Sequence, residues 1–456
     1  MAELPQNWIE SKLEYMVWHK KGSKPKKLYI SMQEGYVPYI DIKAFEKNIL
    51  EQYTEINLAK LTKPNNILVV WDGARAGLVG LAPCIGAIGS TLVDIEPKTK
   101  EIINKYLYYF LFSNYAYINS KPRGTGTPHV NPDLYWNMLI PLPPSNEQKR
   151  IVEKLDKMIR IVDDVNARLN KIPTALKRAR QSILNQAITG ELTKDWREKN
   201  LDIIPASIMI EQFKQLLLES SSKNERDNIN NIFSYKENYF SFDIPHTWTF
   251  SILEKLCKSF KYGTSTKSES SGLVPVLRMG NIQKGEIDWN DLVYTSDSKE
   301  IEKYKLEKND VLFNRTNSPE LVGKTAIYRG ERAAIYAGYL IKIENYKILN
   351  SEYLNYALNS TFAKEWKLDV KTDGVSQSNI NAQKLAKFEV PLPPLEEQAE
   401  IVRRVKLAFE KLDKIESRYQ KAKEYFDKLT QSILNKAFRG ELVPQDPNDS
   451  PIKIPE

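Results

Sequence analysis

The sequence predicts an α+β protein in which two globular domains are joined by two long helices that form an antiparallel coiled coil. Two observations support this fold class. The segment 140–192 recurs at 390–442, an offset of 250 residues without a gap, and the copies are identical at 20 of 53 positions. Each copy also carries apolar residues at the heptad spacing of a coiled coil. The chain is therefore an internal duplication whose globular parts have diverged.

The heptad seam runs along both copies of the repeated segment. Its positions recur every seven residues at Leu155, Val162, Leu169, Leu176 and Ile183 in the first copy and at Leu412, Tyr419, Phe426 and Ile433 in the second. A second apolar set is interleaved with this one, among charged residues. Apolar positions sustained over several heptads predict two long helices that pack along a narrow seam. The alternative is that each helix is buried separately in its own globular core.

Both long helices have recognisable end signals. A Pro-Pro pair precedes each start, and Gly190 and Gly440 stand near the ends, as C-caps do. Pro173 should kink the first helix, whereas Lys423 holds the matching place in the second. Because the first helix leads away from the first globular block and the second returns, the pairing is expected to be antiparallel. The two blocks would then be related by a pseudo-two-fold axis.

The rest of the chain divides around these helices. The expected order is a first block at 1–139, a long helix at 140–192, a linker with a short helix at 193–239, a second block at 240–389, a long helix at 390–442 and a tail at 443–456. Apolar runs between turn residues predict strands at 67–73 and 87–95, and a helix follows at 102–113. Within 193–239, the sequence predicts a short amphipathic helix at 208–218. The polar stretch 220–231 is expected to be an exposed connection.

The composition narrows the class of protein. No apolar run approaches the ~18 residues of a membrane-spanning helix, and the N-terminus lacks a signal-peptide pattern, which favours the cytoplasm. With only Cys84 and Cys257, neither a disulfide framework nor a multi-cysteine zinc site is expected. The formal net charge of +8 favours a polyanionic partner.

Traces of catalytic motifs are incomplete. The run 323–325 (Gly-Lys-Thr) resembles the end of a phosphate-binding loop, but Ser318 stands where the first glycine is needed. The run 131–135 resembles an amino-methyltransferase motif, but Asp133 replaces its second proline, so a turn is expected. The three histidines, His19, His129 and His246, lack metal-ligand spacing. No catalytic residue or metal ligand is therefore expected, and a binding protein is favoured over an enzyme.

Two loops in each block mix basic, amide and small residues. The loops at 71–75 and 314–318 follow predicted strands at matching places, and those at 121–126 and 371–377 form a second matching pair. Arginine pairs with guanine, and asparagine or glutamine with adenine, in the major groove. The candidate DNA-binding residues are Arg75, Lys121, Arg123, Thr125, Arg278, Asn281, Asn314, Arg315, Lys371 and Gln377. One such loop is more often a solvated turn, but matching loops in both halves favour a function.

With these residues in place, the chain resembles the DNA-specificity subunits of type I restriction–modification systems. The resemblance lies in the Pro-Leu-Pro-Pro…Glu-Gln…Ile-Val openings at 141–152 and 391–402 and in the Ser-Ile-Leu-Asn…Gly-Glu-Leu endings. The Pro…Trp starts of both blocks, the turn at 72–75 and the run from Gly374 to Ile380 also match. The resemblance covers essentially the whole chain.

The resemblance implies two target-recognition domains, each reading one half of a split, asymmetric DNA site. It implies that the helices dock two methyltransferase (modification) subunits, which restriction/translocase subunits join. S-adenosylmethionine, ATP and Mg would belong to those partners, and this chain would bind no cofactor. The first block departs from the pattern, because 124–129 (Gly-Thr-Gly-Thr-Pro-His) stands where the family often places a glutamine, as Gln377 is placed in the second.

Two other functions stay open at this point. A fused enzyme with its own catalytic domain is disfavoured, because the two half-repeats account for the whole chain. A coiled-coil scaffold holding two protein-binding domains, without base-specific recognition, is the stronger alternative. The basic charge and the Arg/Asn/Gln loops argue against it, and salt-sensitive DNA binding would separate the two functions.

Overall fold

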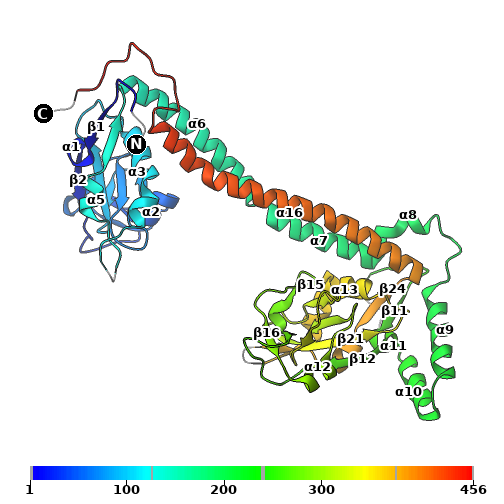
Figure 1. Cartoon of the computed structure of the whole chain (residues 1–456). Helices are drawn as coiled ribbons and strands as arrows, with labels where there is room; N and C mark the ends of the chain where they lie inside the picture. Colours follow the sequence, from blue (N-terminus) through cyan, green and yellow to red (C-terminus); the bar gives the residue numbers. More distant parts are fainter. Residues whose placement is uncertain (1–3, 125–126, 238–241, 375–376, 454–456) are drawn as a thin grey trace. The chain divides into compact units, whose positions relative to one another are not determined.

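The computed structural model describes residues 4–124, 127–237, 242–374 and 377–453 (Figure 1). The chain forms two compact units, Met1–Lys171 with Tyr419–Glu456, and Ile172–Arg418. Each unit combines a globular α+β domain with segments of both long helices, so the predicted fold class is confirmed. Among the described residues, no helix has the length and apolar character needed to cross a lipid bilayer.

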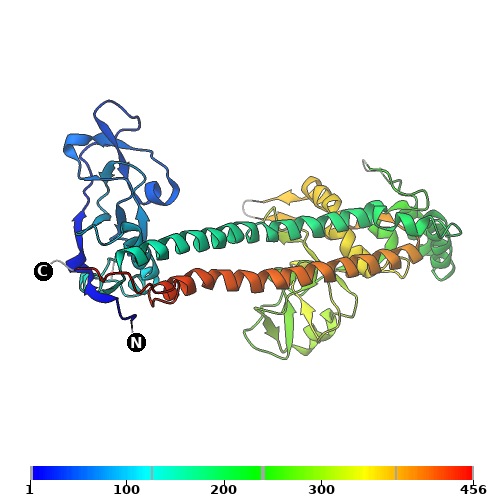
Figure 2. The ribbon, with the colours of Figure 1, turned by 90° about the horizontal axis from the view of Figure 1, so that it is seen from above.

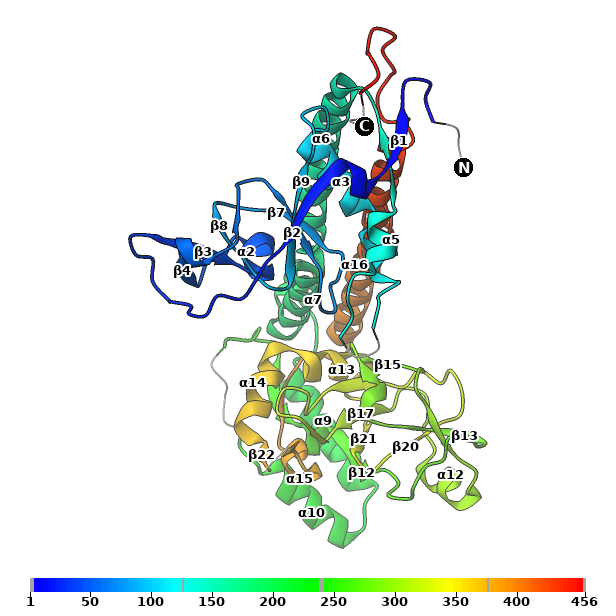
Figure 3. The same ribbon diagram turned by 90° about the vertical axis from the view of Figure 1, so that its left-hand side faces the viewer.

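The first domain contains two small sheets (Figure 3). One has the strand order β2 (Val17–Lys21), β9 (Leu92–Pro97), β6 (Ile67–Val70) and β7 (Val79–Leu81), and the other β4 (Tyr53–Glu55), β3 (Tyr36–Ile40), β8 (Gly86–Ile88) and β5 (Leu61–Thr62). A third, two-stranded sheet joins β1 (Ile9–Lys12) to β10 (Leu139–Leu142). Ile67 and Val69 of β6 enter one core, and Leu68 and Val70 enter another. Because both faces of β6 are buried, its end holds the 71–75 loop in a fixed place.

Short helices complete the first domain. They are α1 (Leu13–Met16), α2 (Ile42–Lys47), α3 (Asn104–Ser113), α4 (Tyr115–Asn119) and α5 (Pro132–Trp136). The Asn131 side chain accepts hydrogen bonds from the first backbone N–H groups of α5. The turn predicted at 131–135 is therefore a capped helix, since asparagine is a strong N-cap and Pro132 suits the first helical position.

The second domain repeats this plan with a larger main sheet. Its order is β12 (Cys257–Tyr262), β21 (Leu340–Asn345), β17 (Val311–Asn314), β19 (Thr325–Ile327), β15 (Glu286–Ile287) and β14 (Ile282–Gln283). Smaller sheets contain β16 (Val293–Thr295), β13 (Val274–Leu277) and β20 (Ile335–Tyr336), and β11 (Thr249–Ile252) with β24 (Glu389–Leu392). The helices are α11 (Leu253–Leu256), α12 (Ser298–Tyr304), α13 (Ser351–Asn359), α14 (Thr361–Val370) and α15 (Ala382–Ala386). β17 is buried at every residue and takes the place that β6 has in the first domain.

The first long segment is two helices, α6 (Ser145–Leu169) and α7 (Ile172–Thr189), while the second is one helix, α16 (Leu395–Ala437). The kink expected at Pro173 is thus a break just before the proline, which cannot donate the backbone hydrogen bond that continues a helix. In the second unit, Arg180 contacts Glu416 at 3.2 Å, and Arg404 donates to the Leu192 carbonyl at 2.9 Å. From the first contact to the second, the residue number rises along the first helix segment and falls along α16. The two helices are therefore antiparallel (Figure 2).

The seam residues differ in burial. Leu155, Val162, Leu176 and Ile433 are buried, whereas Leu169, Ile183, Leu412, Tyr419 and Phe426 are partly buried. In the first unit, α6 and the last turns of α16 share one core with the globular domain. In the interleaved set Ile415 is 46% exposed, so the seam does not cover every apolar residue.

The linker contains more helix than the sequence suggested. It holds α8 (Lys194–Arg197), α9 (Ala206–Glu219) and α10 (Lys223–Phe233). The stretch 220–231, expected to be a linker, is exposed but largely helical. Ser222 and Glu225 form a capping box at the start of α10, which satisfies backbone N–H groups that would otherwise lack partners.

The Glu-Gln pair that opens each long helix is a structural anchor. Gln148 accepts from the Ile103 N–H at 2.8 Å, and Gln398 accepts from the Asn350 N–H at 2.7 Å. The adjacent glutamates are buried: Trp8 donates to Glu147 at 3.1 Å, and Trp248 donates to Glu397 at 2.7 Å. Each pair thus fastens a helix start to the globular domain of its own unit.

Candidate DNA interface

In the first domain, a hairpin lies beside the loop that ends β6. Arg123 and His129 pair through two backbone hydrogen bonds of 2.9 and 3.1 Å, and His129 is bridged on its other side to Asp72. The predicted loops 71–75 and 121–126 therefore form one surface. Residues 125–126, and with them the candidate Thr125, lie outside the described part of the chain.

A cluster of charges surrounds this bridge. His129 Nδ1 lies 2.7 Å from one carboxylate oxygen of Asp72, and Lys21 of β2 lies 2.8 Å from the other. These residues and Arg123 line a shallow depression of about 390 Å³. Lys21 and Arg123 outnumber the one carboxylate of Asp72, so these side chains carry a net positive charge. Such a surface suits the phosphate backbone of DNA.

The other candidates of the first domain lie close to this surface. Arg75 forms an ion pair with Glu46 of α2, and its side chain remains 50% exposed. The Lys121 ammonium lies 4.5 Å from the centroid of the Tyr117 ring. Arg123 is exposed. All three side chains are therefore open to a partner, although Arg75 would have to exchange its carboxylate for a phosphate or base.

The second domain builds the same surface with a three-stranded sheet. It has the order β18 (Thr316–Asn317), β23 (Ser378–Asn379) and β22 (Thr372–Asp373). The predicted loops 314–318 and 371–377 are again neighbours. The Arg315 guanidinium lies 4.5 Å above the Tyr262 ring, which limits its motion.

Arg278 and Arg315 line one depression of about 580 Å³ in the second domain. Hydroxyl and basic side chains of the loop 264–268 complete its wall. Lys371 is held by Asp373, and Gln377 is exposed directly before β23. The structure thus brings Arg278 next to Arg315, which are distant in sequence.

Two of the candidate DNA-binding residues, Asn281 and Asn314, are not on the surface, because their side chains face the protein interior. Asn281 is 2% exposed, and its amide donates to the carbonyls of Asp288 and Asn290, at 2.9 Å each, while its oxygen accepts from the Arg278 N–H. Asn314 is fully buried as the last residue of β17. Asn281 thus shapes its own loop, and neither buried side chain reaches the surface that DNA would contact.

The arginines of the two domains are not equivalent. The Trp71 carbonyl accepts from Val130 N–H, and the Arg315 carbonyl accepts from Ile380 N–H, both at 2.9 Å. This matching pattern aligns Arg315 with Trp71 and leaves Arg75 four residues further along. The predicted loops 71–75 and 314–318 therefore match in place but not residue by residue, because the loop of the second domain is longer by two residues before the matching Gly77 and Gly323.

A buried lysine supports the longer loop. Lys367 of α14 donates to the carbonyls of Gly323 and Leu358, both at 2.5 Å, in the space that Ile118 fills beside Gly77 in the first domain. Burial, with a smaller contribution from Lys364, lowers the pKa of Lys367 to about 7.

This lysine predicts a pH dependence of stability. Its pKa is lower in the folded than in the unfolded chain, so the unfolded chain binds more protons between pH ~7 and ~10.5 and folding stability rises over that window. We expect Lys367→Met to flatten the rise, measured by thermal unfolding at a series of pH values. The exposed Lys347→Met is the matched control, and an unchanged slope in the Lys367 variant would contradict the assignment.

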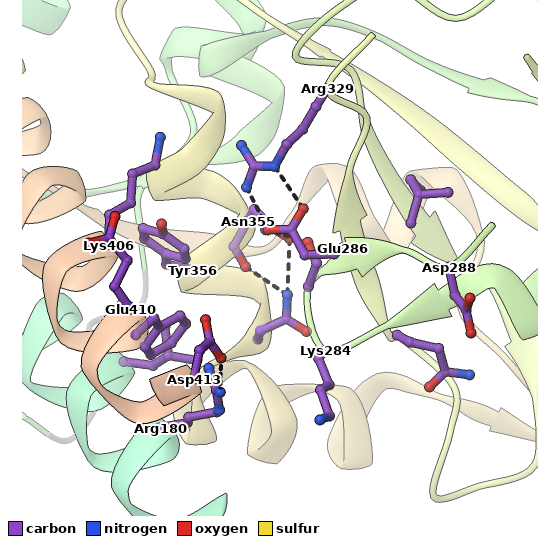
Figure 4. Close-up of a pocket in the computed structure, with 16 residues that line it drawn as sticks. Arg180, Lys284, Glu286, Asp288, Arg329, Asn355, Tyr356, Lys406, Glu410 and Asp413 are labelled. Carbon is purple, nitrogen blue, oxygen red and sulfur yellow. Dashed lines mark hydrogen bonds and ion pairs between the residues drawn. The ribbon is translucent and has the colours of Figure 1, made fainter. Parts of the chain in front are cut away.

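A charged cavity lies in the second unit between the β14–β15 turn, α13 and the helices α7 and α16 (Figure 4). Its volume is about 480 Å³. Lys284, at the tip of the turn, pairs with Glu416 of α16 at 2.9 Å, and Arg329 bridges Glu286 and Glu352. These ion pairs join the domain to its helices. The cavity lining carries four cations, Arg180, Lys284, Arg329 and Lys406, and four carboxylates, Glu286, Asp288, Glu410 and Asp413, so its formal charges balance.

The same junction is built with opposite charges in the two units. In the first unit Lys105 of α3 pairs with Asp156 of α6 at 2.7 Å, and in the second Glu352 of α13 pairs with Lys406 of α16 at 2.7 Å. The repeat aligns Lys105 with Glu352 and Asp156 with Lys406. Burial alone would raise the pKa of Glu352, but Arg329 and Lys406 lower it below the ordinary value, so the carboxylate stays charged.

The sequence interpretation missed several residues of these surfaces. They are Lys21, Asp72 and His129 in the first domain, Tyr262 and Lys267 in the second, and Asn379, which contacts Arg315 and Thr316. One signal was available, because the 250-residue offset also aligns His129 with Asn379. In the described residues, no group of three or more His, Cys, Asp or Glu side chains is placed to hold a metal ion.

Known proteins share this architecture. The family model described as the type I restriction modification DNA specificity domain matches residues 5–174 and 245–424. The EcoKI specificity subunit of Escherichia coli (strain K12) is 28% identical over 471 residues, covering 97% of this chain and 91% of that protein. The EcoDI specificity subunit of Escherichia coli is 31% identical over 359 residues, covering 77% and 72%.

Two solved structures share the fold. A structure from work on complex assembly and conformational transition of the type I R-M system has a TM-score of 0.67 at 20% identity, covering 96% of this chain and 100% of that chain. The HsdS subunit from Thermoanaerobacter tengcongensis has a TM-score of 0.56 at 19% identity, covering 96% and 98%. Since the family model matches both halves over most of their length, this chain belongs to the family of type I restriction modification DNA specificity domains.

Proposed function

We propose that this chain is the specificity subunit of a type I restriction–modification complex, in which it selects the DNA and catalyses no reaction itself. Each globular domain reads one half of a bipartite site. The two domains have diverged in their loops, so the two half-sites differ and the target is asymmetric. Reading two half-sites with one chain multiplies discrimination without requiring a larger domain.

One observation carries the proposal: both domains place a hairpin against the end of a buried strand and surround it with basic side chains. In the first domain these are Lys21 and Arg123, and in the second Arg278 and Arg315. Phosphate contacts position a protein on DNA and base-edge contacts provide specificity, and each surface contains groups for both. A scaffold for two protein partners would not require this repeated pattern.

The partners follow from the family. We propose that the chain acts with two methyltransferase subunits and with restriction/translocase subunits, and that its helices contact the former. S-adenosylmethionine, ATP and Mg would be bound by those subunits, and none by this chain. We propose that the complex acts in the cytoplasm, where the relatives' restriction systems would meet DNA.

The test is the salt dependence of DNA binding by the assembled complex. Neutralised phosphates release counterions, so the logarithm of affinity should fall linearly with the logarithm of salt concentration. A library of randomised DNA should also yield a motif in two parts. A complex that binds DNA without sequence preference, or a chain that assembles with protein partners and leaves DNA binding unchanged, would favour the scaffold.

The Arg123→Ala variant tests whether Arg123 contacts a phosphate or reads a base. If Arg123 contacts a phosphate, its loss should weaken binding to all sequences about equally and reduce the salt slope by about one. If it reads a base, one position of one half-site should relax. Lys100→Ala removes one exposed positive charge from the same domain and is the matched control. An Arg123 variant that behaves like this control would remove the residue from the interface.

A further inference from the structure

In each domain, backbone β-pairing between the loop and the hairpin places two side chains next to each other at the centre of the candidate DNA interface. Asp72 is bridged to His129 in the first domain, and Thr316 to Asn379 in the second. The matching backbone hydrogen bonds described above establish that these are equivalent positions. The backbone is thus shared by both domains, while the two side chains that it carries differ.

Each pair is joined by one short hydrogen bond across the bridge. His129 Nδ1 lies 2.7 Å from Asp72 Oδ1, and Asn379 Nδ2 donates to Thr316 Oγ1 at 2.7 Å. An ionised carboxylate only accepts, so Nδ1 of His129 carries the proton. In the neutral imidazole, Nε2 is then left as an acceptor. In Asn379 one amide hydrogen remains to pair, and the carbonyl oxygen, which accepts from Arg315 at 3.5 Å, has a second lone pair to offer.

The residues around each pair hold it in place. Lys21 occupies the second oxygen of Asp72, and the backbone of His129 is paired on both sides. Asn379 lies between β18 and β22, with Arg315 Nη2 at 3.5 Å from its oxygen. The His129 side chain is nevertheless 47% exposed. Rigid backbone, fixed orientation and exposure together are what a base-reading side chain needs.

We propose that these central pairs determine base preference, and this inference rests on the proposed function. His129 reads an exocyclic amino group, adenine N6 or cytosine N4, through Nε2, and Asp72 is the positioning residue that fixes its orientation. Asn379 reads adenine through its amide. The surrounding cations, Lys21 and Arg123 in the first domain, hold the phosphates.

The experiment uses the complex reconstituted from this chain and its modification subunits. Bound sequences are selected from a DNA library with both half-sites randomised, for the unmodified chain and for His129→Asn, Asp72→Asn and Asn379→Ala. We expect His129→Asn to change the preference at one position of one half-site by about tenfold or more. Asp72→Asn should relax the same position, and Asn379→Ala one position of the other half-site.

The controls separate this inference from the proposed function. If the unmodified complex selects no motif, the proposed function fails. If it selects a bipartite motif but the variants keep every base preference, or weaken all sequences uniformly, only the reading role fails. Should His129→Asn not assemble, the isosteric Asp72→Asn tests the same position. Lys100→Ala is expected to leave the motif unchanged.

Discussion

The Glu397→Ala variant is expected to lose ~3–5 kcal/mol of unfolding free energy, because it leaves a partly buried guanidinium without its carboxylate. Glu397 is fully buried and accepts from Arg197 at 2.6 Å, Thr193 at 2.7 Å and Trp248 at 2.7 Å. One side chain therefore joins the start of α16, the segment of Thr193 and α8 that follows α7, and the start of the second domain. For a unit of this size the loss corresponds to a melting temperature lower by about 10 °C.

The neighbouring glutamate provides the control. Glu396 is exposed on the same helical turn, so Glu396→Ala should change stability by less than ~0.5 kcal/mol. Glu147→Ala in the first unit should have a smaller effect than Glu397→Ala, because its direct donors, Trp8 and Gln445, are uncharged. Equal melting temperatures for the Glu397 and Glu396 variants, measured by calorimetry, would show that the buried cluster does not stabilise the unit.

Val162→Asp should disrupt the helix pair of the first unit. Val162 is 2% exposed on α6 and belongs to the core that also contains Ile433 and Leu434 of α16. An aspartate there loses apolar burial and places a charge without a partner among apolar side chains, which should cost ~3–5 kcal/mol. We expect loss of cooperative unfolding in the first unit and loss of the assembled complex, measured by calorimetry and size-exclusion chromatography.

The preceding residue tests whether the position or the chemistry matters. Ile161 is 52% exposed on the same helix, so Ile161→Asp introduces the same charge without burying it. That variant should keep its melting temperature within about 2 °C, as surface substitutions change stability little. If both aspartates destabilise the unit to the same extent, Val162 does not hold the helices together.

Periodic and duplicated features were predictable from the sequence. The long helices, their caps at Gly190 and Gly440 and the matching loops depend on local spacing, which survives in a single sequence. Gly440 has a positive φ of 74°, and an added Cβ would meet the ring of Pro5, so this cap also packs against the start of the first domain. The sequence signalled the glycine, but the contact between the two chain ends depends on the fold.

Side-chain direction and register were not predictable. Asn281 and Arg278 lie three residues apart, yet one is buried and the other lines the surface. The Asn281 amide folds back to bond the Arg278 N–H and the carbonyls of Asp288 and Asn290, whereas the Arg278 side chain extends into the depression. The alignment of Arg315 with Trp71 depends on interstrand hydrogen bonds. The loop of the second domain is two residues longer than that of the first, so matching the two loops by sequence does not give the correspondence of their individual side chains.

The inverted ion pairs have a consequence for how the duplicated halves stay distinct. Lys105 faces Asp156, and Glu352 faces Lys406, so each domain complements the helix of its own unit and would meet a like charge on the other. Like charges at contact distance disfavour an exchange of partners between related halves. A newly duplicated gene would have had interchangeable halves. Charge inversion at this junction therefore favours the packing of each globular domain on the helix of its own unit.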